Sequence, residues 1–271
     1  MTTPATLRAF PQEIVWQSEI GIESFGVRLG LRSNAVGPLE AYRPFLPPGS
    51  QPIDPADAER VYSIIQHEAG YDLLEGTNPL ACGTDLPTLF GILESDVQIH
   101  LGETAPGRIF VHAGVVAWQG RAILVPGASF SGKTTLVSAL LQAGATYYSD
   151  EFAVLDRDGL IHPYPRLLSL RVPGSPLPKR CAPADFGTQA GAEPLQPGII
   201  VLTEFRQQVR WQPKPLSTGI ALLTLLSSTL PIRKRPTESL IALQNTLARA
   251  RVLHGARGEA EEMVQALLAA A

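Results

Sequence analysis

Residues 127–134 read Gly-Ala-Ser-Phe-Ser-Gly-Lys-Thr and complete the pattern G-x-x-x-x-G-K-[ST] of a phosphate-binding loop. Glycine at the first and sixth positions of such an octet, here Gly127 and Gly132, lets the backbone turn tightly, so that successive amide N–H groups point at polyphosphate oxygens. Lys133 is placed to reach the β- and γ-phosphates, and the Thr134 hydroxyl is placed to bind Mg²⁺. We therefore expect a site for ATP and Mg²⁺ made by Gly127, Ala128, Ser129, Phe130, Ser131, Gly132, Lys133, Thr134 and Thr135.

The segments on either side of the octet have the periodicity that a phosphate-binding loop requires. Residues 122–125 form a short apolar run of the buried-strand type, which Pro126 and Gly127 end. Downstream, apolar residues recur at helical spacing from Leu136 to Leu141, and Gly144 is well placed as a C-terminal cap. The sequence therefore predicts a strand, a glycine loop and a helix in that order.

Two adjacent carboxylates, Asp150 and Glu151, follow a short strand expected over residues 145–149. A hairpin is expected next, with residues 152–156 pairing with residues 160–164. A carboxylate at the end of a strand that faces bound phosphates can act as a general base or as a metal ligand. Asp150 is a candidate for both roles and Glu151 for the complementary one. The alternative is a solvated turn between two strands.

Composition and charge limit the class of protein. With 271 residues, of which 45% are hydrophobic, the chain can bury the core of one large domain or two modest ones. The formal net charge of −3 gives no electrostatic case for a nucleic-acid partner. Two cysteines are too few for a disulfide framework, and neither a secretion signal nor a long apolar span is present. We expect a cytoplasmic protein with no membrane partner.

The chain divides into two regions by its pattern of breaks and periodicity. A strand-like start over residues 20–31 precedes a proline cluster, and Asp54 with Pro55 then has the signature of a helix start, with Val61, Ile64 and Ile65 on its apolar side. A second helix is expected over residues 87–95. These elements predict a small α+β N-terminal lobe over residues 1–105, of unknown role. A nucleotide-binding α/β domain is predicted over residues 106–271.

Within the second region, several further elements are expected. Residues 173–197 are rich in proline, glycine and alanine, which is typical of a mobile loop or lid. A strand is expected over residues 199–203. Helices are expected over residues 216–226, 238–253 and 259–268.

The chain resembles the catalytic domain of HPr kinase/phosphorylase, a family of bacterial protein-serine kinases with a phosphoenolpyruvate-carboxykinase-like P-loop fold. The resemblance is carried by His112, which precedes Gly127 by 15 residues, by the intact octet, and by Asp150, which follows Lys133 by 17 residues. It covers roughly residues 108–172. Thr135, Glu151 and Ala113 stand where the family has Glu, Asp and Gly, so the chain is similar to a divergent member, most of all to the HPr-kinase-like proteins of peptide modification clusters.

The resemblance implies further site residues. His112 would contact the transferred phosphate, although a histidine on an apolar strand is also commonly a hydrogen-bonded core residue. Arg171 matches an arginine of the family, whereas the basic trio Arg233, Lys234 and Arg235 matches a basic stretch loosely and otherwise has the pattern of a solvated helix entrance. Arg257 is a weaker candidate. A symmetric homo-oligomer is also implied.

The function expected from these features is an ATP- and Mg²⁺-dependent kinase. It would transfer the γ-phosphate to a Ser or Thr hydroxyl of a small protein or peptide. Two alternatives stay open: a nucleotide-binding regulatory module without catalysis, and a small-molecule kinase or nucleotide hydrolase built on the same core.

Overall fold

The computed structural model describes residues 14–127, 132–171, 174 and 179–270. The chain forms two compact units, each with a mixed β-sheet and helices: Met1–Leu46 with Ser50–Val97, and Pro47–Gly49 with Gln98–Ala271. The division falls within helix α2 (Leu86–Thr104), a few residues before the boundary expected after residue 105. The expected loop residues Ala128, Ser129, Phe130 and Ser131 lie outside the described residues.

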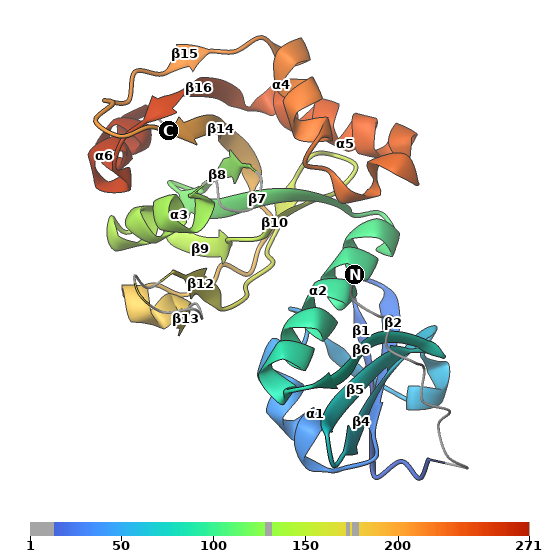
Figure 1. Cartoon of the computed structure of the whole chain (residues 1–271). Helices are drawn as coiled ribbons and strands as arrows, with labels where there is room; N and C mark the ends of the chain where they lie inside the picture. Colours follow the sequence, from blue (N-terminus) through green and yellow to red (C-terminus); the bar gives the residue numbers. More distant parts are fainter. Residues whose placement is uncertain (1–13, 128–131, 172–173, 175–178, 271) are drawn as a thin grey trace, which may run out of the picture. The chain divides into compact units, whose positions relative to one another are not determined.

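Unit 1 is built on a six-stranded sheet in the order β3-β1-β2-β4-β5-β6. Strands β2 and β4 are parallel, and the other neighbours are antiparallel. Apolar side chains of β2 and β4 are fully buried beside α1 (Gly37–Tyr42) and the first part of α2 (Figure 1). The strands are β1 (Ser18–Ser24), β2 (Val27–Ser33), β3 (Gln51–Ile53), β4 (Arg60–His67), β5 (Gly70–Glu75) and β6 (Asn78–Thr84).

The helix predicted to start at Asp54 is wrong beyond its first turn. Asp54 does cap a short 3-10 helix (Pro55–Asp57), and its carboxylate accepts a hydrogen bond of 2.9 Å from the Ala56 amide. The chain then enters β4, which contains Val61, Ile64 and Ile65 and is hydrogen-bonded to β2 on one side and β5 on the other. β-Branched residues favour such a doubly paired strand, and this preference overrides the local helix-start signal.

Unit 2 is built on an eight-stranded sheet in the order β11-β10-β7-β8-β14-β16-β15, with β9 also paired to β7. Strands β8, β14 and β16 are parallel, so their carboxyl ends share one edge of the sheet. A separate ribbon pairs β12 with β13. The strands are β7 (Ile109–Trp118), β8 (Arg121–Pro126), β9 (Thr146–Ser149), β10 (Phe152–Leu155), β11 (Ile161–His162), β12 (Leu168–Leu170), β13 (Lys179–Cys181), β14 (Gln196–Phe205), β15 (Lys214–Pro215) and β16 (Arg251–Arg257).

Helices cover both faces of the large sheet (Figure 1). Because side chains alternate along a strand, Ile123 and Val125 of β8 pack in the cluster that includes α3 and α6, whereas Ala122 and Leu124 pack with α4 and α5. The helices are α3 (Lys133–Gln142), α4 (Thr218–Leu226), α5 (Pro236–Arg249) and α6 (Ala260–Ala270). Unit 2 is therefore a sheet between two helical layers, and the octet begins directly after the central strand β8.

Most elements expected in unit 2 are confirmed, and two are corrected. The strand over residues 122–125, the helix after the octet, the strand over 199–203 and the helices over 216–226 and 259–268 are present, as is the hairpin β10–β11. The helix expected over 238–253 ends at Arg249, and Arg251 begins β16. In the described residues 179–197, β13 and a 3-10 helix (Pro183–Phe186) form and Cys181 and Leu195 are buried, so this part is not wholly without packed structure as expected; most of its other residues are partly or fully exposed.

Candidate functional site

The two glycines of the octet, Gly127 and Gly132, are positioned by the sheet and by the helix that follows. Gly127 directly follows β8, and its amide donates to the His112 carbonyl on β7 (3.3 Å). Gly132 is the N-terminal cap of α3 and has φ +82°, a left-handed conformation that glycine adopts at little cost. The octet thus starts at the carboxyl end of a central strand and ends at a helix N-terminus, the arrangement that the sequence predicted.

The Lys133 side chain is folded back over the octet. It is only 7% exposed, and its Nζ donates to the Gly127 carbonyl at 2.8 Å. Burial lowers the pKa of Lys133, while the nearby Glu151 and Asp150 oppose this shift. A desolvated cation between two carboxylates and the start of the loop is suited to binding an anionic phosphate group.

The acidic pair lies beside the octet because of the way β9 and β10 run along β7. Both strands pair antiparallel with β7, and Asp150-Glu151 forms the break between them. Opposite this break, the Ala113 amide donates to the Glu151 carbonyl at 3.0 Å, and Ala113 pairs on its other side with Pro126 of β8. The carboxylates are therefore one strand away from the start of the octet, and Asp150 is buried rather than solvated.

Asp150 is buried and surrounded by hydrogen-bond donors. Its Oδ1 accepts from the Tyr147 hydroxyl at 3.0 Å, and its Oδ2 lies 3.5 Å from the Thr134 hydroxyl and 3.4 Å from the Ser169 amide. Burial raises the pKa of Asp150 to about 6, Glu151 adds to this, and the Tyr147 hydrogen bond opposes it. Asp150 and Thr134, the two predicted metal ligands, are thus brought together.

Glu151 has a different environment from its neighbour. Its side chain is 37% exposed, and its Oε1 lies 3.1 Å from the His112 Nε2. His112 therefore lies next to one of the two predicted catalytic carboxylates and not only among core residues. The pair has the geometry of a carboxylate oriented by an imidazole, with one member accessible to solvent.

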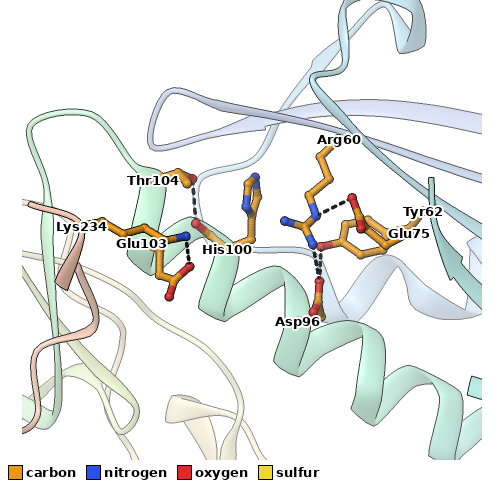
Figure 2. A network of polar contacts seen from close by, with 8 residues as sticks. All are labelled: Arg60, Tyr62, Glu75, Asp96, His100, Glu103, Thr104 and Lys234. Carbon is orange, nitrogen blue, oxygen red and sulfur yellow. Dashed lines mark hydrogen bonds and ion pairs between the residues drawn. The ribbon is translucent and has the colours of Figure 1, made fainter. Parts of the chain in front are cut away.

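The basic residues expected to supply positive charge do not all lie in the same place. Arg171 is exposed and directly follows β12, whose Ser169 contacts Asp150. Lys234 instead pairs with Glu103 near the end of α2 at 2.6 Å (Figure 2). Arg235 donates to the carbonyls of Ala105 and Arg108, both at 2.9 Å. Lys234 and Arg235 therefore attach α5 and the turn before it to the segment preceding β7.

Unit 1 has a polar network of its own, farther toward the N-terminal end of α2. Arg60 of β4 lies 3.3 Å from Glu75 and 3.3 Å from Asp96, and Asp96 also accepts from the Tyr62 hydroxyl at 2.6 Å (Figure 2). These contacts join the sheet of unit 1 to the helix.

Two contacts of the site have little or no signal in the sequence. Tyr147, which holds Asp150, lacks any motif and is placed only by its strand. Arg257 is a weak candidate by sequence, yet it is 2% exposed and its Nη2 donates to the Gly132 carbonyl at 3.1 Å. Residue spacing in the sequence predicts neither contact, because each depends on which strands become neighbours in the folded protein.

A metal at this site would need ligands from outside the protein. Among the described residues, no group of three or more His, Cys, Asp or Glu side chains could hold a metal ion. Thr134 and Asp150 supply two oxygens, which fits Mg²⁺ because this ion is commonly bound by one or two protein oxygens together with phosphate groups and water.

Comparison of the chain with protein-family models and with curated proteins finds no match. In the part of the chain that the structure describes, no helix is long and apolar enough to cross a membrane.

Proposed function

We propose that this protein is an ATP- and Mg²⁺-dependent kinase that transfers the γ-phosphate to a Ser or Thr hydroxyl of a small protein or peptide. The observation that carries the proposal is the convergence of Lys133, Thr134 and Asp150 at one end of β8. Phosphoryl transfer asks a protein chiefly for positioning and for neutralisation of charge, and these three groups supply both.

The nucleotide phosphates would lie over the octet. Amides at the N-terminal end of α3 and the Lys133 ammonium would hold the β- and γ-phosphates, and Lys133 would exchange its bond to the Gly127 carbonyl for bonds to phosphate oxygens. Thr134 and Asp150 would bind Mg²⁺, which neutralises charge on the phosphates. Two ligands at right angles in an octahedral Mg²⁺ site lie about 3 Å apart, close to the 3.5 Å between these oxygens.

Glu151 is the carboxylate best suited to act as the general base. Asp150 is buried and already accepts hydrogen bonds from the Tyr147 hydroxyl and the Ser169 amide, whereas Glu151 is partly exposed and is oriented by His112. Glu151 would take the proton of the acceptor hydroxyl while the hydroxyl oxygen bonds to the γ-phosphorus. The bond from the γ-phosphorus to the bridging oxygen then breaks, and ADP leaves with that electron pair.

The class of acceptor comes from the resemblance to HPr kinase/phosphorylase, since a phosphate-binding loop does not define its acceptor. The partner would be a small protein or peptide that bears a serine. The partly exposed Glu151 side chain and the exposed Arg171, two residues after the Ser169 that contacts Asp150, support an acceptor that approaches from solvent.

The test is to incubate the protein with Mg²⁺-ATP and a panel of small proteins and serine peptides, and to measure ADP and added phosphate by mass spectrometry. We expect equal amounts of ADP and phosphorylated acceptor with the wild type and neither with Glu151→Gln. ADP with free phosphate and no modified acceptor would identify a hydrolase instead. Nucleotide binding without ADP would identify a regulatory module.

A further inference from the structure

Arg257 occupies a place that packing alone does not explain. It is the last residue of β16, next to Phe205 of β14, and only 2% of it is exposed. Its guanidinium carbon lies 5.5 Å from the centre of the Phe205 ring. Burial of a guanidinium is costly unless an anion compensates its charge.

The structure provides Arg257 with hydrogen bonds but with little negative charge. Nη2 donates to the Gly132 carbonyl at 3.1 Å and Nη1 to the Gly258 carbonyl at 3.0 Å, while the buried Nε has no acceptor among the described residues. No carboxylate in the described part of the chain lies within ion-pair distance of this guanidinium; Glu259 and Glu261 act on it only at longer range. The charge of Arg257 is therefore compensated only at a distance by the described residues.

Its neighbour, the Gly132 carbonyl, is the last backbone group of the octet before α3. The Gly132 carbonyl also accepts the first hydrogen bond of the helix, from the Leu136 amide at 3.1 Å. Arg257 therefore donates to the second lone pair of this carbonyl oxygen. Lys133 is tied to the first residue of the octet in the same manner, through the Gly127 carbonyl. The carbonyls of Gly127 and Gly132 thus each accept a hydrogen bond from a buried cation.

The positive charge here is larger than Lys133 alone provides. The N-terminus of α3 carries the positive end of the helix dipole, Lys133 is the first residue of that helix, and Arg257 donates to its N-terminal cap, Gly132. Asp150 and Glu151 offset part of the charge of Lys133, and Glu259 and Glu261 offset part of that of Arg257. An anion of high charge would compensate the remainder, and a polyphosphate would do so better than a monophosphate.

We propose that Arg257 is a positioning residue of the polyphosphate site, which fixes the Gly132 end of the octet and adds a second buried positive charge that a bound triphosphate compensates. This inference rests on the proposed function and extends it to the C-terminal strand. It predicts that the contribution of Arg257 grows with the number of phosphates in the ligand. A purely structural residue would affect all ligands alike.

The experiment compares Arg257→Met and Arg257→Lys with Arg251→Met, an exposed arginine at the start of the same strand. Inorganic tripolyphosphate, ATP and AMP are titrated into each protein by calorimetry. We expect Arg257→Met to weaken tripolyphosphate and ATP about tenfold or more, because a hydrogen-bonded charge is lost, and AMP much less. Arg257→Lys should recover part of the affinity, and Arg251→Met should bind as the wild type does.

A second readout is the thermal midpoint with and without tripolyphosphate. Without ligand, Arg257→Met should be as stable as the wild type or more so, since an uncompensated buried charge is removed. With ligand, its stabilisation should be smaller. Equal tripolyphosphate affinity in Arg257→Met and the wild type would overturn the inference while leaving the kinase proposal intact. Failure of the wild type to bind any polyphosphate would overturn both.

Discussion

The Thr134 hydroxyl lies 3.5 Å from the Asp150 carboxylate, although 16 positions separate the two residues in the chain. Helix α3 and strand β9 bring them together: Thr134 ends the octet in the first turn of α3, and Asp150 directly follows β9. This distance is long for a hydrogen bond between oxygens. The distance suits two oxygens that bind the same cation. It therefore favours the role of metal ligand for Asp150 and leaves the role of general base to Glu151.

Replacing each carboxylate by its amide should separate these roles. We expect Glu151→Gln to lower kcat about 100-fold or more, because the general base is lost, with nucleotide affinity and the Mg²⁺ requirement unchanged. Initial rates of acceptor phosphorylation against Mg²⁺ concentration provide the measurement. Near-normal transfer by Glu151→Gln would mean that the base is misassigned.

Asp150→Asn should act mainly on the metal. We expect it to raise the Mg²⁺ concentration needed for half-maximal rate by about tenfold or more, since a charged ligand is replaced by a neutral one. ATP binding in the absence of Mg²⁺ should be retained. An unchanged Mg²⁺ dependence would contradict the assignment of Asp150 as a metal ligand.

The pKa of Asp150 also predicts a pH dependence of stability without ligand. Because burial raises this pKa from 3.8 to about 6, the folded protein binds the proton more tightly than the unfolded chain does. Stability contributed at this residue is therefore present below pH 4 and is lost as the pH rises through 6. At about 1.4 kcal/mol per unit, the loss is up to about 3 kcal/mol.

Asp150→Asn carries no such charge, so its free energy of unfolding relative to the wild type should increase between about pH 4 and pH 7. Urea denaturation across this range measures the difference. Asp158→Asn, in the exposed turn of the β10–β11 hairpin, is the matched control and should show no comparable trend. A constant difference between Asp150→Asn and the wild type would show that Asp150 does not titrate near pH 6.

Gly132 should tolerate a methyl group less well than another glycine with the same backbone conformation. Gly132 has φ +82°, and a Cβ there would collide with Arg257 Nη2, whereas a Cβ on Gly120, with φ +76°, would meet no atom within 4 Å. Both alanine variants should lose about 1–2 kcal/mol of stability from backbone strain. Only Gly132→Ala should also lose tripolyphosphate affinity. Equal affinities in the two variants would show that Gly132 and Arg257 need not be in contact for binding.

The sequence predicts the parts of this site that depend on local signals. Gly127, Gly132 and the apolar spacing after Lys133 predict a strand, a loop and a helix, and the strand and the helix form as expected. The contact of Arg257 with Gly132 could not be predicted, because it depends on β16 pairing beside β14. Residues 251–253 instead carry a helical signal, since Val252 and Leu253 extend the apolar pattern of the preceding helix and no glycine or proline intervenes.

Unit 1 illustrates the same limit in the opposite direction. Asp54 and Pro55 carry a genuine capping signal and form the expected cap, yet only a single short turn follows it. Pairing of β4 with strands on both sides decides the structure of residues 60–67; the β-branched Val61, Ile64 and Ile65 favour a strand, but local sequence does not specify its pairing partners. Local chemistry predicted the cap, and tertiary contacts determined what came after it.

The most direct test of the central claim is calorimetric titration of Mg²⁺-ATP into the wild type, Lys133→Ala and Lys214→Ala. Lys214 is an exposed lysine on the edge strand β15 and serves as the matched control. We expect the wild type and Lys214→Ala to bind with the same affinity and Lys133→Ala to show no measurable binding, because the ammonium that meets the β- and γ-phosphates is gone. Equal binding by Lys133→Ala and the wild type, or no binding by the wild type, would contradict the assignment of residues 127–134 as a nucleotide site.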